Sequence, residues 1–149
     1  MAIQEFLKDW TLQYIRHMDA FDKSILEILE EPGRIVVKHK KKTQTYIPVA
    51  ELAQDKVKVS DVPLTIVTLN TKANFERLIK DWKMLARQPG LKLIFINPDS
   101  SLERKWAICP HTHSRISDDD SLRLGLMSLF QTVEEISEAD AKRLAERNE

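Results

Sequence analysis

Residues 109–120, CPHTHSRISDDD, gather the side chains of this sequence that are best suited to metal chemistry. They include the single cysteine, Cys109, two of the four histidines, His111 and His113, and the aspartates at 118–120. Imidazole and carboxylate groups are common zinc ligands, and a zinc site takes three or four ligands from the protein. His111, His113 and Asp118 are therefore candidate ligands for zinc or another divalent metal. With such a metal the chain would be a metal-dependent hydrolase or nuclease.

The spacing of the two histidines also fits a simpler interpretation. On an extended strand over 105–113, Cys109, His111 and His113 would face the same way, with neighbours about 6.5 to 7 Å apart. Two histidines could then share one ion, but the three side chains would span roughly 13 Å, which is too far for one metal. A further ligand would have to come from a remote part of the chain. The alternative is two polar histidines held in hydrogen bonds near a strand end.

The acidic end of the stretch favours a structural role. Ser117 can accept a hydrogen bond from a backbone N–H of a first helical turn, and carboxylates at 118–120 oppose the positive end of a helix. Three adjacent carboxylates on a helix point in different directions and do not form a metal cage. We therefore predict a helix cap here in preference to a set of catalytic acids. Cys109 is either a buried, inert thiol or a reactive one.

Charge is distributed unevenly along the 149 residues, although the net charge is zero. Residues 1–32 carry three basic and seven acidic groups, a balance of −4, and residues 117–149 carry four and nine, a balance of −5. Residues 33–116 carry sixteen basic and seven acidic groups, a balance of +9. One cysteine, and no apolar run near the roughly 20 residues of a membrane span, favour a cytoplasmic protein that does not bind membranes.

The basic excess is most concentrated in the segment KHKKKT, between two predicted strands. Arg34, Lys38, Lys40, Lys41 and Lys42 crowd this hairpin and would form a positive ridge. Such a ridge can bind nucleic-acid phosphates with little sequence preference and with strong salt dependence. The alternative is a solvated hairpin tip, whose lysines discourage edge-to-edge pairing of strands.

The hydrophobic pattern predicts a single α/β (α+β) domain that positions these residues. Residues 1–31 carry apolar residues at spacings of three and four, which predicts one long helix or two shorter ones. Residues 34–116 hold a mixed sheet of about five strands with a crossover helix, and 117–149 hold a C-terminal helix and a charged tail. The predicted order is α-β-β-β-α-β-β-α, with helices flanking the sheet. Residues 50–61 are predicted to form a polar loop or a short helical turn.

Two further predictions concern the middle of the chain. The periodicity after residue 70 predicts a helix that buries Trp82 against the sheet, beside Phe75, Leu78 and Ile79. The segment 97–106, NPDSSLERKW, has strong turn chemistry and is predicted to form an exposed connection between two neighbouring strands.

The order of helix, three strands, helix and strand resembles the core of restriction-endonuclease-like proteins, the PD-(D/E)xK superfamily. The closest stretch, residues 64–98 (LTIVTLNTKANFERLIKDWKMLARQPGLKLIFINP), looks like the third strand, following helix and fourth strand of that core. The resemblance implies a nuclease with an aspartate and an acid-x-lysine at the end of the third strand, which hold magnesium. This chain has Thr68, Leu69 and Asn70 there. The resemblance therefore implies a member without the catalytic motif, of the kind that serves in binding or scaffolding.

Taken together, the residues predict a non-catalytic α/β binding or scaffold domain that needs no cofactor. Its partner would be another protein, a second copy of the chain, or nucleic acid. The alternative is a metal-dependent hydrolase or nuclease built on the His111-x-His113 pair.

Overall fold

The computed structural model describes residues 2–53 and 63–147; most of the loop predicted over 50–61 lies outside the described residues. In chain order the elements are α1 (Ile3–Met18), β1 (Ile25–Glu31), β2 (Arg34–His39), β3 (Thr43–Pro48), β4 (Leu64–Leu69), α2 (Lys72–Lys80), α3 (Trp82–Leu85), β5 (Leu91–Ile96), β6 (Lys105–Ile108), α4 (Pro110–Ile116), α5 (Asp119–Gln131) and α6 (Glu138–Arg147). Within these ranges no helix is both long enough and apolar enough to cross a bilayer.

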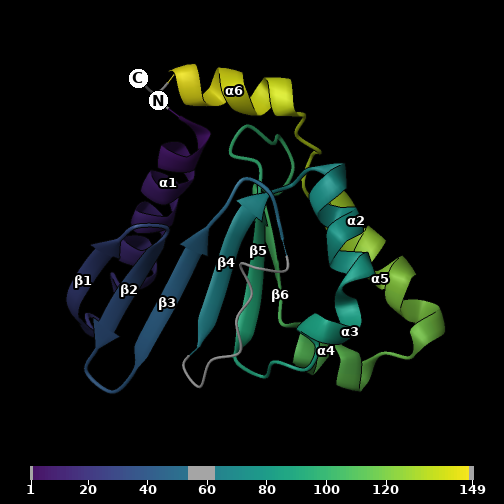
Figure 1. Cartoon of the computed structure of the whole chain (residues 1–149), viewed down its shortest axis with the longest axis horizontal. Helices are drawn as coiled ribbons and strands as arrows, with labels where there is room; N and C mark the ends of the chain where they lie inside the picture. Colours follow the sequence, from purple (N-terminus) through teal and green to yellow (C-terminus); the bar gives the residue numbers. More distant parts are fainter. Residues whose placement is uncertain (1, 54–62, 148–149) are drawn as a thin grey trace.

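A mixed sheet forms the centre of the molecule, with its strands in the order β1-β2-β3-β4-β5-β6 (Figure 1). The first three strands form an antiparallel meander, β3, β4 and β5 run parallel, and β6 returns antiparallel to β5. The α+β class and the mixed sheet are as predicted. The sheet has six described strands where about five were predicted, because one strand forms in the N-terminal segment.

The prediction of helix throughout residues 1–31 is wrong in its second half. α1 ends at Met18, and residues 25–31 form the edge strand β1, which pairs with β2. The carboxylate of Asp19 accepts hydrogen bonds from the N–H of Ser24 at 2.9 Å and from that of Ile25 at 3.3 Å, which turns the chain. Apolar spacing alone could not reveal this turn, because Ile25 is half-buried in the strand as it would be in a helix. Pairing with β2 therefore overrides the helical pattern.

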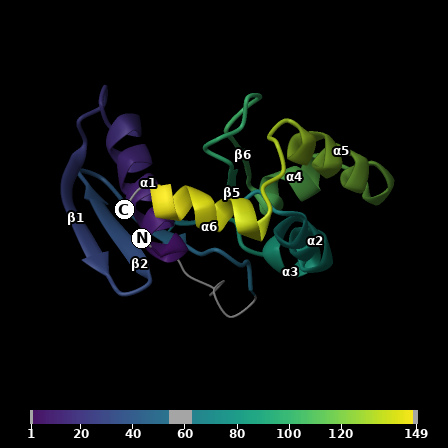
Figure 2. The same ribbon diagram turned by 90° about the horizontal axis from the view of Figure 1, so that it is seen from above.

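Helices cover both faces of the sheet, and each face has its own hydrophobic core (Figure 2). On one face, α1 and α6 pack over residues that include Ile35, Val37, Tyr46, Val67, Leu69, Ile94 and Ile96. On the other, α2, α3 and α5 pack over residues that include Ile66, Leu93, Phe95, Trp106 and Ile108. The charged C-terminal tail therefore contributes α6 to a core, through the buried Ala141, Leu144 and Ala145.

Trp82 is buried, with 7% of its surface exposed, and lies in one core cluster with Phe75 and Leu78. This confirms the predicted burial, although the helix is divided at Asp81, so that Trp82 begins the short helix α3. The predicted connection between the neighbouring strands β5 and β6 is confirmed for residues 97–104, but Lys105 and the buried Trp106 belong to β6 itself. Residues 101–104 are exposed in this connection, while Asn97 and Ser100 are buried.

Candidate functional site

The predicted strand over 105–113 ends early, and this separates the two histidines. β6 stops at Ile108, and Pro110 is the first residue of α4, a position where the missing N–H of proline costs nothing. His111 and His113 therefore lie on a helix, where residues two apart do not face each other. The predicted shared face of Cys109, His111 and His113 is accordingly wrong.

Each candidate metal ligand has a structural partner of its own. The Nδ1 atom of His111 lies 2.9 Å from the carbonyl oxygen of Ala86, and the ring of His113 meets Trp82 edge-on, with centroids 5.8 Å apart. In the described ranges no group of three or more histidine, cysteine, aspartate or glutamate side chains is placed to hold a metal ion. Cys109 is exposed, which rules out the buried, inert interpretation of its thiol.

Asp118, and not Ser117, caps the helix that follows. Its Oδ1 accepts hydrogen bonds from the hydroxyl of Ser121 at 2.7 Å and from the N–H of Ser121 at 2.8 Å. These two bonds hold the pKa of the Asp118 carboxyl below its ordinary value. The predicted helix cap is therefore present, but the capping residue is Asp118 and not Ser117. Ser117 instead ends α4.

The polar residues that follow β4, where the predicted resemblance would place a catalytic motif, bind other parts of this chain. The side chain of Asn70 is fully buried. Its Oδ1 accepts a hydrogen bond from the indole N–H of Trp106 at 2.7 Å, and its Nδ2 donates to the carbonyl of Val133 at 3.1 Å. Asn70 thus ties the segment after α5 to the sheet.

Asn74, one turn into α2, fixes the segment after β3 in a similar way. Its Oδ1 accepts from the N–H of Leu52 at 2.9 Å, and its Nδ2 donates to the carbonyl of Ala50 and to the hydroxyl of Thr68, each at 3.0 Å. The amides of Asn70 and Asn74 are therefore occupied by structural hydrogen bonds. Neither supplies a carboxylate.

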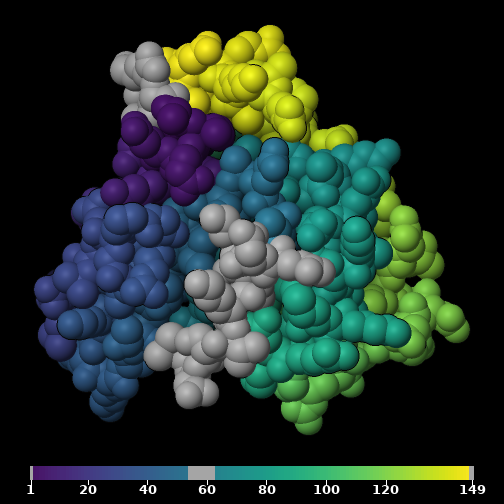
Figure 3. Space-filling model, in the orientation of Figure 1, coloured from purple at the N-terminus to yellow at the C-terminus, as the bar shows by residue number. Residues whose placement is uncertain are grey.

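The five basic candidates divide into two groups on the β2 strand and the turn that follows it. The Nε of Arg34 lies 2.8 Å from the carboxylate of Glu31, and the Nζ of Lys38 lies 3.7 Å from that of Glu27. The lysines at 40–42 form the β2–β3 turn, are exposed, and make no ion pair with any residue that the structure describes. This turn lies at the lower edge of the molecule in Figure 3. Of the five basic residues, Lys40, Lys41 and Lys42 therefore remain the candidates for phosphate contacts.

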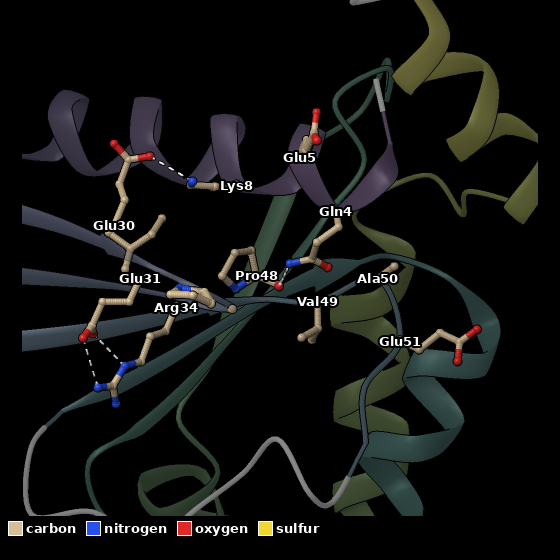
Figure 4. A pocket seen from close by; sticks show the side chains of 13 residues that line it. Gln4, Glu5, Lys8, Glu30, Glu31, Arg34, Pro48, Val49, Ala50 and Glu51 are labelled. Atoms are coloured by element: carbon tan, nitrogen blue, oxygen red, sulfur yellow. Dashed lines mark hydrogen bonds and ion pairs between the residues drawn. The ribbon is translucent and has the colours of Figure 1, made fainter.

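A groove of about 700 Å³ lies at the opposite end of the β2–β3 hairpin, between the start of α1 and the sheet (Figure 4). It lies at the carboxyl end of β3, and ligands of open α/β sheets bind outside the carboxyl ends of strands. The side chain of Gln4 in α1 donates a hydrogen bond to the carbonyl of Pro48, which fixes the helix to this strand end. The residues lining the groove are Gln4, Glu5, Lys8, Glu30, Glu31, Pro32, Gly33, Arg34, Ile35, Pro48, Val49, Ala50 and Glu51.

The described lining of this groove combines apolar and acidic side chains. Ile35 and Val49 are buried apolar residues, whereas four glutamates, one lysine and one arginine line the groove with a balance of −2. Lys8 pairs with Glu30 at 3.0 Å, and Arg34 pairs with Glu31. The remaining two carboxylates, on Glu5 and Glu51, are exposed and form no ion pair with a described residue. We call this the acidic groove.

Sequence reasoning missed the acidic groove because its residues come from three separate segments. Residues 4–8, 30–35 and 48–51 meet only through the order of strands in the sheet. The turn Pro32-Gly33 was visible in the sequence, and Gly33 has the positive φ, +76°, that favours glycine. The predicted helix over 1–31, however, would make this turn the end of a helix and not the turn of a hairpin. A correct assignment of β1 was needed to bring Glu30 and Glu31 to the groove.

A second hollow of about 720 Å³ lies next to the acidic groove, at the start of α2 and beneath α6. Its described lining includes Lys72, Arg77 and Lys142, and also three glutamates, at 51, 135 and 138. These charges balance, whereas those that line the acidic groove do not.

Fold and site together define an α+β domain with a six-stranded mixed sheet and an acidic groove at one end of that sheet. Comparison with protein-family models, with curated proteins and with solved structures finds no significant match to this chain. The chemistry of the groove is therefore the guide to the function of this chain.

Proposed function

We propose that this chain is a non-catalytic binding domain, which holds a basic segment of a partner protein in the acidic groove. The observation that carries the proposal is the combination of buried apolar residues with an excess of glutamate in one open groove. Lysine and arginine side chains have a long apolar stem and a cationic head, so they complement such a surface well. Glu5 and Glu51 are the two carboxylates free of described ion pairs and are thus the main candidates to meet those cations.

The side chains in the groove and near the end of β4 favour binding over catalysis. The described residues that line the groove include no serine, threonine, cysteine or histidine, and its lysine and two of its four glutamates are held in the ion pairs Lys8–Glu30 and Arg34–Glu31. Asn70, after β4, and Asn74, in the first turn of α2, are engaged in structural hydrogen bonds. The proposal agrees with the resemblance to a nuclease-like core that has lost its catalytic carboxylates.

A direct test is a fluorescence anisotropy titration with a labelled peptide in which lysines alternate with valines. We expect saturable binding that weakens as salt rises, because exposed charges are screened within about 10 Å at 0.1 M salt. Glu5→Gln combined with Glu51→Gln should weaken binding roughly 2- to 30-fold, since an exposed charge pair contributes about 0.2–1 kcal/mol.

The matched control is Glu76→Gln combined with Glu103→Gln, because both glutamates are exposed and lie outside the groove. This pair changes the net charge by the same amount and should leave the peptide affinity unchanged. Equal losses of affinity in both double variants would mean that only net charge matters. That outcome, or equal binding of a peptide with glutamate in place of lysine, would contradict the proposal.

We also expect no magnesium-dependent cleavage of DNA or RNA. Thr68, Leu69 and Asn70 at the end of β4 provide neither the carboxylate that holds magnesium nor the neighbouring lysine. The assay is incubation of purified protein with labelled duplex DNA and RNA, with magnesium or with chelator. Cleavage that needs magnesium and disappears on mutation of a single named carboxylate would overturn the non-catalytic assignment.

A further inference from the structure

We infer that a second copy of this chain supplies a basic segment for the acidic groove, and that the β2–β3 turn with Lys40, Lys41 and Lys42 is that segment. The inference rests on the proposed function and names one partner for it. The β2–β3 turn, which we call the tip, carries three lysines, and the acidic groove carries an excess of glutamates. In neither are all of these charges paired with opposite charges of the described chain.

The lysine turn is held in place before any partner arrives. The N–H of Lys40 donates to the carbonyl of Ser24 at 2.9 Å, and the Nδ1 of His39 lies 2.7 Å from the hydroxyl of Ser24. The Nε2 of His39 lies 3.1 Å from the side-chain oxygen of Gln44, on the next strand. These contacts join the turn to the start of β1 and to β3. A partner groove therefore meets three lysines on a supported turn, which lowers the entropy cost of association.

The two complementary surfaces lie at opposite ends of one strand. Arg34, at the start of β2, lines the acidic groove, and the lysine turn follows His39, at the end of the strand. Six strand residues separate these ends by about 20 Å, at roughly 3.3 Å per residue. The tip of one molecule therefore cannot reach its own groove. Contact between them requires a second molecule.

Joining the tip of one copy to the groove of the next gives a head-to-tail contact. Each molecule then keeps one unused tip or groove, so that further copies can add, either in a ring or in an open chain. The contact is small and charged. It should therefore be weak, dependent on protein concentration, and sensitive to salt.

Sedimentation velocity over a range of protein concentrations, at about 20 mM and about 500 mM salt, tests this inference. At low salt we expect the average mass to rise with concentration above that of the 17.3 kDa chain, and to return to that value at high salt. The tip variant Lys40→Gln, Lys41→Gln, Lys42→Gln should remain monomeric at low salt. The groove variant Glu5→Gln, Glu51→Gln should need about 2- to 30-fold more protein to associate, and should be monomeric at concentrations where the wild type has begun to do so.

Mixing the two variants gives the sharpest result. One intact tip and one intact groove remain in the mixture, so the variants should associate and stop at twice the 17.3 kDa chain mass. A wild-type chain that stays monomeric at low salt while still binding the lysine–valine peptide would overturn this inference and leave the proposed function standing. A mixture that stays monomeric, or self-association that persists in the tip variant, would overturn it as well.

Discussion

Replacing Trp82 with alanine is expected to lower the free energy of unfolding by about 3 to 5 kcal/mol, the usual range for removing a core aromatic side chain. Trp82 is 7% exposed and belongs to the core between α2, α3, α5 and the sheet. Its removal leaves a cavity beside Phe75 and Leu78 and takes away the edge contact with His113. Urea denaturation followed by circular dichroism gives the measurement.

The control for this variant is Phe21→Ala, because Phe21 is 97% exposed in the turn after α1. Surface substitutions of this kind change stability by about 0.5 kcal/mol or less. If Trp82→Ala were no more destabilising than Phe21→Ala, α3 would not pack against the sheet as described.

Replacing Asn70 with leucine should cost about 2 to 6 kcal/mol, although leucine is apolar and of similar size. The substitution leaves the indole N–H of Trp106 and the carbonyl of Val133 without their hydrogen-bond partner. A buried polar group left unpaired costs about 1–3 kcal/mol. Two such groups give the expected range, and urea denaturation measures it.

Gln131→Leu, at the exposed end of α5, is the matched amide-to-leucine control and should change stability by about 0.5 kcal/mol or less. An Asn70→Leu protein as stable as the wild type would mean that the Asn70 amide does not hold the segment after α5. The polar residues at this strand end would then not have the structural role assigned to them.

The elements with the strongest local signals could be predicted from sequence. The fully buried strand at 64–69 and the apolar helical face with Phe75 and Leu78 gave the parallel strand–helix–strand unit correctly. Residues 25–31 could not be assigned, because half-buried Ile25 and Ile28 fit a helical spacing equally well. Pairing with β2 decides their structure, and that pairing is a property of the whole sheet.

The candidate sites could likewise be predicted only in part from the sequence. The histidines at 111 and 113 stood out by residue type, yet Pro110 starts a helix there and directs them to Ala86 and Trp82. The acidic groove had no local motif, because Glu5, Glu30 and Glu51 come from distant segments. The uneven charge along the chain does not by itself bring these groups together. Only the arrangement of strands shows that acidic and basic groups gather at opposite ends of one hairpin.

The most direct test of the central claim is to map where a basic peptide binds. Titration of ¹⁵N-labelled protein with the lysine–valine peptide, followed by two-dimensional NMR, reports on each backbone N–H separately. We predict that the largest shift changes fall on the segments 4–8, 30–35 and 49–51, which hold the residues that line the acidic groove. Residues 40–42 should change less, and only where the peptide displaces the turn of a second copy. Shift changes centred anywhere else on the molecule, or none at saturating peptide, would contradict the assignment of the groove as the binding site.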